Sequence, residues 1–164
     1  MERMFVYGLD PGLSRCGYCV LDASGRDPHA VALGVFRTEP HLPVPERLAE
    51  LLVDFRSLLA EFPPHSVAVE RVLFQSNVRT AMGVGQASGV LMAESAARGV
   101  SVREYSPNEV KQAVTGDGAA DKAQVQQMVQ LLLRLPAPPR PADAADAAAI
   151  ALTHVAVTAG VGAR

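Results

Sequence analysis

The chain has 164 residues, of which 49% are hydrophobic and 20% charged, so it can bury one core but is too short for two ordinary domains. We therefore expect one globular domain over residues 1–164. The formal net charge of −2 argues against a polyanionic partner such as DNA, but eight basic and five acidic residues between 71 and 140 give that stretch a local balance of +3. The charge count thus discourages a nucleic-acid partner without excluding one.

The predicted strands and helices alternate as in an α/β domain with a mixed sheet. Three short apolar runs, separated by Pro-Gly and Ser-Gly turns, predict strands over residues 5–9, 17–21 and 30–36. Leucines and phenylalanines three and four residues apart predict a helix over 46–62, followed by a strand over 66–70. Similar patterns predict a helix over 80–98, a strand over 100–105, and helices over 107–114, 122–135 and from 141 to about 159.

No segment predicts export or insertion into a membrane. The first residues lack the basic region and long apolar core of a secretory signal. The most apolar long segment, 142–161, holds two aspartates and a histidine, which are costly inside a bilayer, so it predicts a buried helix. Cys16 and Cys19 are three residues apart in a predicted strand and should face opposite sides, without a disulfide. We expect a cytoplasmic protein with no membrane partner.

Two acidic side chains stand at the ends of predicted strands. Asp10 ends the first strand and is followed by a Pro-Gly turn, and Glu70 ends the fourth strand. Open α/β sheets place their sites at the carboxyl ends of the strands. If the first and fourth strands are parallel neighbours, which the intervening helix permits, the two carboxylates come within reach of one ion.

A second acidic pair lies near the start of the last predicted helix. Asp143 and Asp146 are three residues apart in an alanine-rich stretch, which places both on one helix face. Two like charges at this spacing repel, so we expect them to face a cation, and carboxylate oxygens suit a hard divalent ion. The alternative is that both aspartates only complement the positive end of the helix dipole. The conjunction of all four acids in one small α/β domain favours the metal site.

Six motifs, in this order, resemble those of the RuvC family of Holliday junction resolvases, which belongs to the ribonuclease H-like nucleases. The resemblance covers nearly the whole chain. Its motifs are Gly-Leu-Asp-Pro-Gly at 8–12, Val-Glu-Arg at 69–71, Gly-Gln-Ala-Ser-Gly at 85–89, Val-Lys-Gln at 110–112, Ala-Asp-Lys-Ala-Gln-Val-Gln at 120–126 and Ala-Asp-Ala-Ala-Asp at 142–146.

The resemblance implies a ribonuclease H-like fold, with a mixed five-stranded sheet and helices on both faces. It implies an endonuclease that resolves Holliday junctions by paired symmetric nicks in DNA recombination and repair. Asp10, Glu70, Asp143 and Asp146 would be catalytic and would hold two Mg²⁺ ions per subunit, for which Mn²⁺ can substitute. The implied partners are the four-way DNA junction, a second copy of the chain and a branch-migration helicase complex.

Two lysines are predicted to act beside the acids. Lys122 follows Asp121, a good helix cap, so a cation stands where the helix dipole disfavours one. A phosphate bound at this helix start would remove the mismatch, and the resemblance implies that this lysine lies beside the scissile phosphate. The alternative for Lys122 is an ordinary solvated lysine. Lys111 is a weaker candidate of the same kind.

The segment after Glu70 is predicted to contact DNA. It combines apolar side chains with Arg71 and Arg79, a composition suited to gripping distorted DNA and stacking on an unpaired base. Relatives often carry an aromatic residue three positions after the glutamate, where this chain has Leu73 followed by Phe74. The sequence leaves open which of the two stacks on DNA, and Phe74 as a core residue is an equal alternative.

The helix predicted over 80–98 contains three glycines, at positions 83, 85 and 89. They mimic a nucleotide-binding fingerprint but lack the strand immediately before them that such a site requires. We expect this small-residue helix to line a dimer interface. His154 lies two turns beyond Asp146, too far to share an ion, and is predicted to be structural.

Three other functions fit parts of the pattern. Residues 8–17 could form the phosphate loop of an actin-like ATP-binding phosphotransferase, although those proteins clamp nucleotide between two domains and this chain supplies one. A non-catalytic junction-binding scaffold is disfavoured because four clustered carboxylates without metal repel one another. A nuclease of the same fold that acts on other branched DNA or on RNA stays open.

Overall fold

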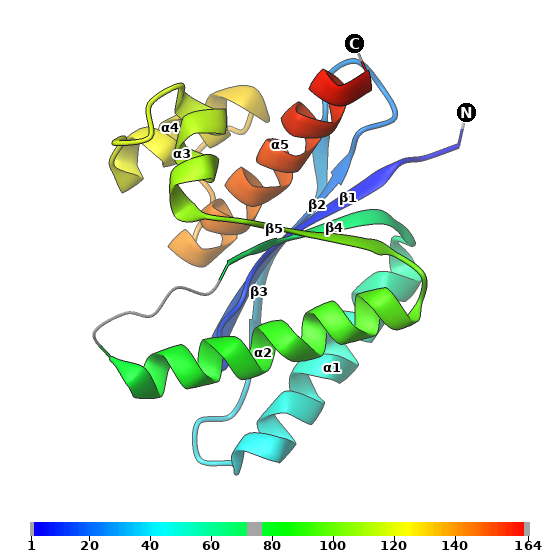
Figure 1. The fold of residues 1–164 in the computed structure, drawn as a ribbon, viewed down its shortest axis with the longest axis vertical. Coiled ribbons are helices and arrows are strands. Elements are labelled where there is room, and N and C mark those ends of the chain that lie inside the picture. Colours follow the sequence, from blue (N-terminus) through cyan, green and yellow to red (C-terminus); the bar gives the residue numbers. More distant parts are fainter. Residues whose placement is uncertain (1, 72–76, 163–164) are drawn as a thin grey trace.

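The computed structural model describes residues 2–71 and 77–162, and its centre is a five-stranded mixed sheet (Figure 1). Every predicted element is confirmed, with its ends within three residues of the expected positions. In chain order the elements are β1 (Phe5–Asp10), β2 (Arg15–Asp22), β3 (His29–Arg37), α1 (Val44–Glu61), β4 (Pro64–Glu70), α2 (Val78–Ala97), β5 (Ser101–Tyr105), α3 (Pro107–Thr115), α4 (Lys122–Leu132) and α5 (Ala142–Gly162).

The strand order β3-β2-β1-β4-β5 puts the first strand in the middle of the sheet. β1 is antiparallel to β2, to which a short turn joins it, and parallel to β4, which the chain reaches through α1. Leu9 pairs with Val69, so the next residues, Asp10 and Glu70, end their strands at the same edge. The predicted parallel pairing of the first and fourth strands is confirmed.

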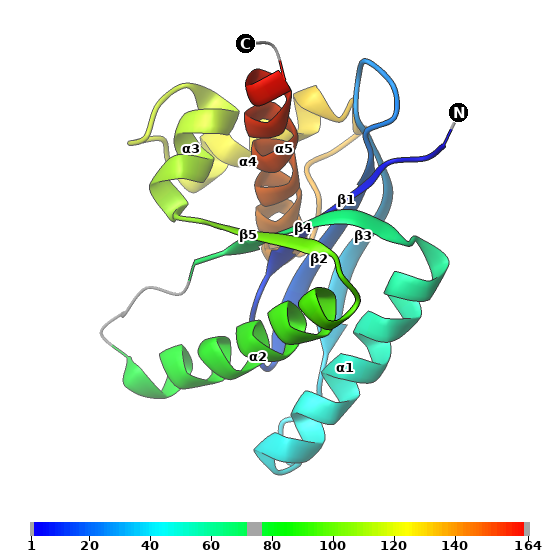
Figure 2. The ribbon, with the colours of Figure 1, turned by 45° about the vertical axis from the view of Figure 1, so that its right-hand side comes forward.

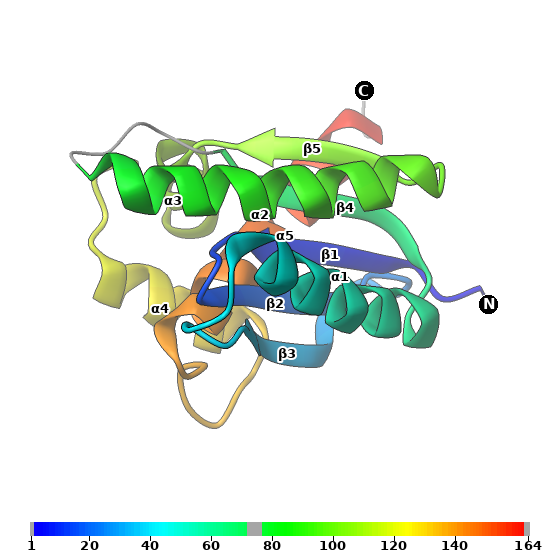
Figure 3. The same ribbon diagram turned by 90° about the horizontal axis from the view of Figure 1, so that it is seen from below.

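Helices cover both faces of the sheet. Figures 1 and 2 show α3, α4 and α5 on one side, and Figure 3 shows α1 and α2 in front of the other. The alternation of side chains along β4 divides the core accordingly, because Val67 and Val69 pack with α1 and α2 while Ala68 packs with α5. Cys16 and Cys19 lie in different cores and both are free, as predicted.

Small residues on both surfaces bring α5 close to the sheet. Opposite the helix stand Gly8 on β1 and Gly17 on β2, where an added Cβ would overlap the carbonyls of Ala147 and Asp143. The alanines that meet Gly8 are Ala147 and Ala151, and the other buried alanines of α5 are Ala144, Ala145, Ala148 and Ala149. The alanine-rich stretch, which the sequence connected only with a nearby cation, therefore has a packing role: it lets α5 carry Asp143 to the end of β1.

Gly8→Ala should test this close approach. We expect the free energy of unfolding to fall by about 1–3 kcal/mol or more, because α5 must move away from the sheet to admit the methyl group. Urea denaturation measures the change. The matched control is Gly25→Ala, where nothing lies within 4 Å of the new methyl and a change below about 0.5 kcal/mol is expected. Equal losses in the two variants would contradict the close approach.

His154 on α5 is a core residue, as predicted. It is buried, and its Nδ1 lies 2.8 Å from the hydroxyl of Tyr105 on β5. Burial lowers the pKa of His154, which keeps the imidazole neutral at neutral pH. Despite its apolar composition α5 is packed against protein, and no helix among the described residues is long and apolar enough to cross a bilayer.

Candidate active site

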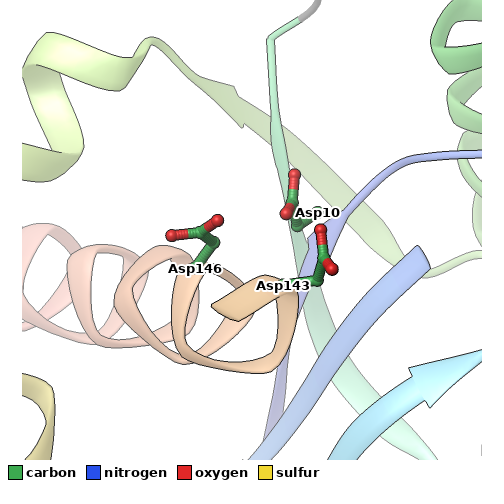
Figure 4. Close-up of side chains that lie close together, drawn as sticks. All are labelled: Asp10, Asp143 and Asp146. Atoms are coloured by element: carbon green, nitrogen blue, oxygen red, sulfur yellow. The ribbon is translucent and has the colours of Figure 1, made fainter. Parts of the chain in front are cut away.

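Three aspartates from two distant parts of the chain converge at the carboxyl edge of the sheet (Figure 4). One carboxylate oxygen from each of Asp10, Asp143 and Asp146 lies within 4.8 Å of the other two. Asp10 comes from the last position of β1, and the other two come from the first turns of α5. All three are half-buried. Since they meet only because α5 crosses the end of β1, the site depends on the glycine contacts described above.

Glu70 reaches the same place from the end of β4. Its carboxyl lies close enough to Asp10 to raise the pKa of that aspartate. Both line a cavity of about 700 Å³ together with Asp143 and Asp146. Glu70 is outside the close group of three, so it flanks the site on the Asp10 side. The four predicted acids therefore share one cavity.

The carboxylates repel one another. Burial, followed by the neighbouring Glu70 carboxyl and the charges of Asp146 and Asp143, raises the pKa of Asp10 far above its usual value. Burial also raises the pKa of Asp146, although Lys122 opposes the shift. Without metal, this site therefore favours a proton on Asp10. These carboxylates repel one another when all are charged. A hard divalent cation prefers oxygen ligands, and by binding here it would displace the proton and neutralise the repulsion.

Two basic side chains neutralise part of this negative charge. The Nζ atom of Lys122 lies 3.2 Å from Oδ2 of Asp146, and the Nε atom of Arg15 lies 3.4 Å from Oδ2 of Asp143. The charge of Asp146 raises the pKa of Lys122. The sequence pattern predicted Lys122 at the site but did not predict Arg15. The sequence placed Arg15 only five residues after Asp10. Its closeness to the acids follows from the pairing of β1 with β2, which the sequence did not specify.

The start of α4 has the predicted cap. The Asp121 side chain accepts a hydrogen bond from the Gln124 amide, and the Gln124 side chain accepts one from the Asp121 amide. Lys122 is thus the first residue of the helix, as expected. In this structure its unfavourable position at the positive end of the helix dipole is offset by Asp146.

The other predicted DNA-contacting residues lie around the acids at different distances. Lys111 on α3 lines the same cavity as the four carboxylates. Arg79 at the start of α2 lines a second cavity that shares Asp10 and Asp143 with the first. Arg71 is exposed just beyond β4. Leu73 and Phe74 fall outside the described residues, so their stacking role stays a prediction.

Comparison with known proteins decides the family. The family model of the crossover junction endodeoxyribonuclease RuvC matches residues 6–154. The chain belongs to the RuvC family. A curated RuvC from Salinispora arenicola is 54% identical over 153 residues, which are 93% of this chain and 87% of that protein.

Solved structures agree with the RuvC assignment. A structure of Thermus thermophilus RuvC has a TM-score of 0.89 and 36% identity, and the match covers 96% of this chain and 97% of that one. A second structure, of Thermus thermophilus RuvC in complex with Holliday junction substrate, has the same TM-score of 0.89 with 38% identity and covers 97% of this chain and 96% of that one. The predicted ribonuclease H-like fold is confirmed.

As a RuvC-family member, the chain is a crossover junction endodeoxyribonuclease, a hydrolase of DNA recombination and repair. This assignment replaces the actin-like phosphotransferase and the non-catalytic scaffold that the sequence had left as alternatives. The family also implies a divalent metal, and the close group of Asp10, Asp143 and Asp146 is where this chain offers oxygen ligands for it.

The stability of the metal-free protein should depend on pH through Asp10. Because folding raises the pKa of Asp10, its proton stabilises the fold fully below the ordinary pKa of aspartate, and this contribution is lost as pH rises through the raised value. We expect the free energy of unfolding in EDTA to fall from acid to alkaline pH. Asp10→Asn should remove most of this dependence and stabilise the metal-free protein by about 1–3 kcal/mol at alkaline pH. Parallel pH profiles for the two proteins would contradict the assignment.

Proposed function

We propose that this chain cuts four-way DNA junctions by hydrolysing phosphodiester bonds at the site formed by Asp10, Glu70, Asp143 and Asp146. The observation that carries the proposal is the convergence of three aspartate oxygens within 4.8 Å in a RuvC-family chain. These carboxylates would hold two Mg²⁺ ions per subunit, with Mn²⁺ as a substitute. A related RuvC has been solved with Holliday junction substrate, which supports the same substrate for this chain.

The carboxylates and the lysines would have different roles around the scissile phosphate. Divalent cations bound at the carboxylates would activate a water for attack on the phosphorus and stabilise charge on the leaving 3′ oxygen. Asp10 is the central ligand, because its carboxylate lies within 4.8 Å of oxygens of the α5 pair and is also the one whose pKa Glu70 raises. Lys122 lies 3.2 Å from Asp146 and can offer its charge to a phosphate oxygen at the same site. Lys111 lines the cavity beside it.

The proposal extends beyond the carboxylates. It takes residues 1–164 as a single nuclease domain and Arg71, Leu73, Phe74 and Arg79 as contacts to DNA. A branch-migration helicase complex as partner stays a prediction from the family.

Synthetic substrates test the proposed activity. Purified protein is incubated with a four-way junction, a linear duplex and an RNA–DNA hybrid, with and without Mg²⁺. We expect symmetric paired nicks in the junction alone, only with metal, leaving 5′-phosphate and 3′-hydroxyl ends that DNA ligase can seal. Equal cleavage of the duplex or the hybrid would instead favour a nuclease of the same fold with another substrate.

An exposed face of α2 supports a homodimer. Val78 and Met82 are apolar yet 62% and 61% exposed, and Gly85 and Gly89 continue the same stripe with nothing within 4 Å of an added Cβ. Spacings of three and four residues place all of them on one helix face. We propose that two copies pair through this face, since glycines permit close approach and a two-fold axis suits two opposing cuts. Gly83 lies elsewhere and packs against Leu13.

Gly85→Glu should separate the proposed dimer. Glutamate has a higher helix propensity than glycine, so α2 should stay folded while bulk and charge enter the interface. We expect the dimer dissociation constant to rise at least about tenfold in sedimentation experiments, whereas Gly25→Glu, which adds the same charge elsewhere, leaves it unchanged. A wild-type protein that sediments as a monomer at micromolar concentration would contradict the dimer.

A further inference from the structure

We propose that a groove lined by Arg15, Arg47 and Arg79 binds the phosphate backbone of the DNA strand next to the cleavage site. In this groove Arg47 is held in position to bind a phosphate. Arg15 is a second phosphate ligand, which becomes available when its ion pair with Asp143 weakens. The inference deepens the proposed function and rests on it. Arg15 and Arg47 are absent from the residues that the sequence suggested.

The carboxylates lie between two cavities, which extend towards helices on opposite faces of the sheet. One, of about 700 Å³, extends towards α3 and α4 and contains Lys111 and Lys122. The other, of about 610 Å³, extends towards the starts of α1 and α2. Figures 1 and 2 show these helix pairs on opposite sides of the sheet. Both cavities include Asp10 and Asp143, so a strand whose phosphate sits at the acids must continue past them on either side.

The second cavity has the charge that a phosphate backbone needs. Its basic residues are Arg15, Arg47 and Arg79, and among its described lining residues the only carboxylates are Asp10 and Asp143 of the proposed metal site. With cations bound at those two aspartates, the whole groove is positive. Arginine groups in such a position neutralise phosphates and contribute to sequence-independent DNA affinity.

Arg47 is held in place by neutral partners. Its Nε donates to Oγ1 of Thr38 and its Nη2 to Oγ of Ser14, each at 2.9 Å. Thr38 in turn donates to the carbonyl of Leu13 at 2.6 Å, which ties this arginine to the turn that follows Asp10. These bonds use two of its five N–H donors.

Arg47 also has no acidic side chain within ion-pair distance in the described ranges 2–71 and 77–162. By contrast, Arg56 and Arg98 both pair with Glu94. It is half-buried, so few of its conformations remain to be lost when it binds a ligand. A guanidinium that is positioned, charged and partly free of partners is suited to bind a phosphate through two parallel hydrogen bonds.

Arg15, unlike Arg47, is paired with an acidic side chain. Its side chain is 56% exposed in the same groove, and its Nε lies 3.4 Å from Oδ2 of Asp143. When Asp143 serves as a metal ligand, its charge is shared with the cation and the hold on Arg15 weakens. The guanidinium is then available to a phosphate without leaving the groove. Neutralising Asp143 by substitution should have the same effect, which makes the idea testable without metal.

Junction binding in EDTA tests both arginines, with fluorescence anisotropy over a series of salt concentrations as the readout. Arg47→Gln should weaken binding about five- to tenfold and reduce the slope of log affinity against log salt by about 0.7–0.9, the loss of one phosphate contact. Arg15→Gln should cost less than about twofold in the wild-type background and about five- to tenfold in the Asp143→Asn background.

Two control variants distinguish a lost phosphate contact from two other effects. One is a general change in net charge, and the other is a weakened turn after Asp10. Arg26→Gln removes an equal charge from the β2–β3 turn, at the end of β2 remote from Asp10, and should leave the slope unchanged. Ser14→Ala keeps the Arg47 charge but removes one of the hydroxyls that position it, so the affinity should fall by about twofold while the slope, which counts phosphate contacts, stays unchanged.

Two results would overturn the proposal. The first is an Arg47→Gln slope equal to that of Arg26→Gln, and the second is an Arg15→Gln effect that is the same in both backgrounds. If Arg47→Gln does not fold, the Arg15 comparison decides alone. Cleavage of the same junction by the wild-type protein with Mg²⁺ tests the proposed function separately.

Discussion

Asp10→Asn is expected to abolish junction cleavage while leaving the fold and junction binding in place. The Asp10 carboxylate lies within 4.8 Å of oxygens of the α5 pair, and Glu70 raises its pKa, so its loss removes the ligand at the centre of the site. Asparagine has nearly the same shape and carries no charge. The loss of several kcal/mol of charge stabilisation in the transition state corresponds to a rate lower by on the order of 10³-fold or more.

Single-turnover nicking of a labelled junction in Mg²⁺ measures this effect, and anisotropy with the same junction measures binding. The fold is checked by circular dichroism, and Asn at position 10 should make the metal-free protein more stable, as argued above from the raised pKa of Asp10. Asp54→Asn, on the exposed face of α1, makes the same change of charge away from the site and should cut at the wild-type rate. Wild-type nicking by Asp10→Asn with Mg²⁺ would remove Asp10 from the mechanism.

Lys122→Ala is expected to lower the cleavage rate far more than the junction affinity. The Nζ atom of Lys122 lies 3.2 Å from Asp146, where a phosphate oxygen and the developing negative charge of the transition state would be close to it. Loss of one such charge-stabilising group typically lowers a rate by about 10²–10³-fold. Its contribution to binding is that of one phosphate contact among several, so the affinity should fall by at most about five- to tenfold, far less than the rate.

The variant should fold normally. The Lys122 side chain is 68% exposed, and an ion pair of that kind contributes little to stability. Lys111→Ala is the matched comparison, because Lys111 lines the same cavity from α3 and forms no ion pair among the described residues. We expect a smaller loss of rate there. A single-turnover rate of Lys122→Ala equal to that of the wild-type protein would show that this lysine does not act in the chemical step.

The variants of Asp10 and Lys122 and the variants of Arg15 and Arg47 report on different contributions of the same site. Asp10 and Lys122 act on the reacting phosphate, whereas Arg15 and Arg47 are proposed to hold its neighbours. For the first pair we therefore expect the cleavage rate to fall far more than the junction affinity, and for the second pair we expect the affinity to fall. This division follows from geometry: the first pair lies within the carboxylate cavity, and the arginines line the groove that continues from it.

Local sequence patterns were enough to predict the elements of the fold and to single out the four acids as candidates. Period-two and period-3.6 patterns are local properties of the chain, and β1, α1 and α5 followed them closely. The acids at 10 and 70 were visible because a strand end and a turn are local signals, and those at 143 and 146 because helix spacing places them on one face. The resemblance to the RuvC family then implied that these four acids belong to one site.

The distances between the acids, and the basic side chains that lie beside them, follow from the packing of the folded chain. Glu70 flanks the close group of three, and Arg15 reaches Asp143, because strand register and the docking of α5 set these distances. The docking in turn depends on Gly8 and Gly17, whose missing side chains matter only against a partner surface. Such contacts join residues far apart in the chain, so no pattern of neighbouring residues encodes them, and only packing brings them together.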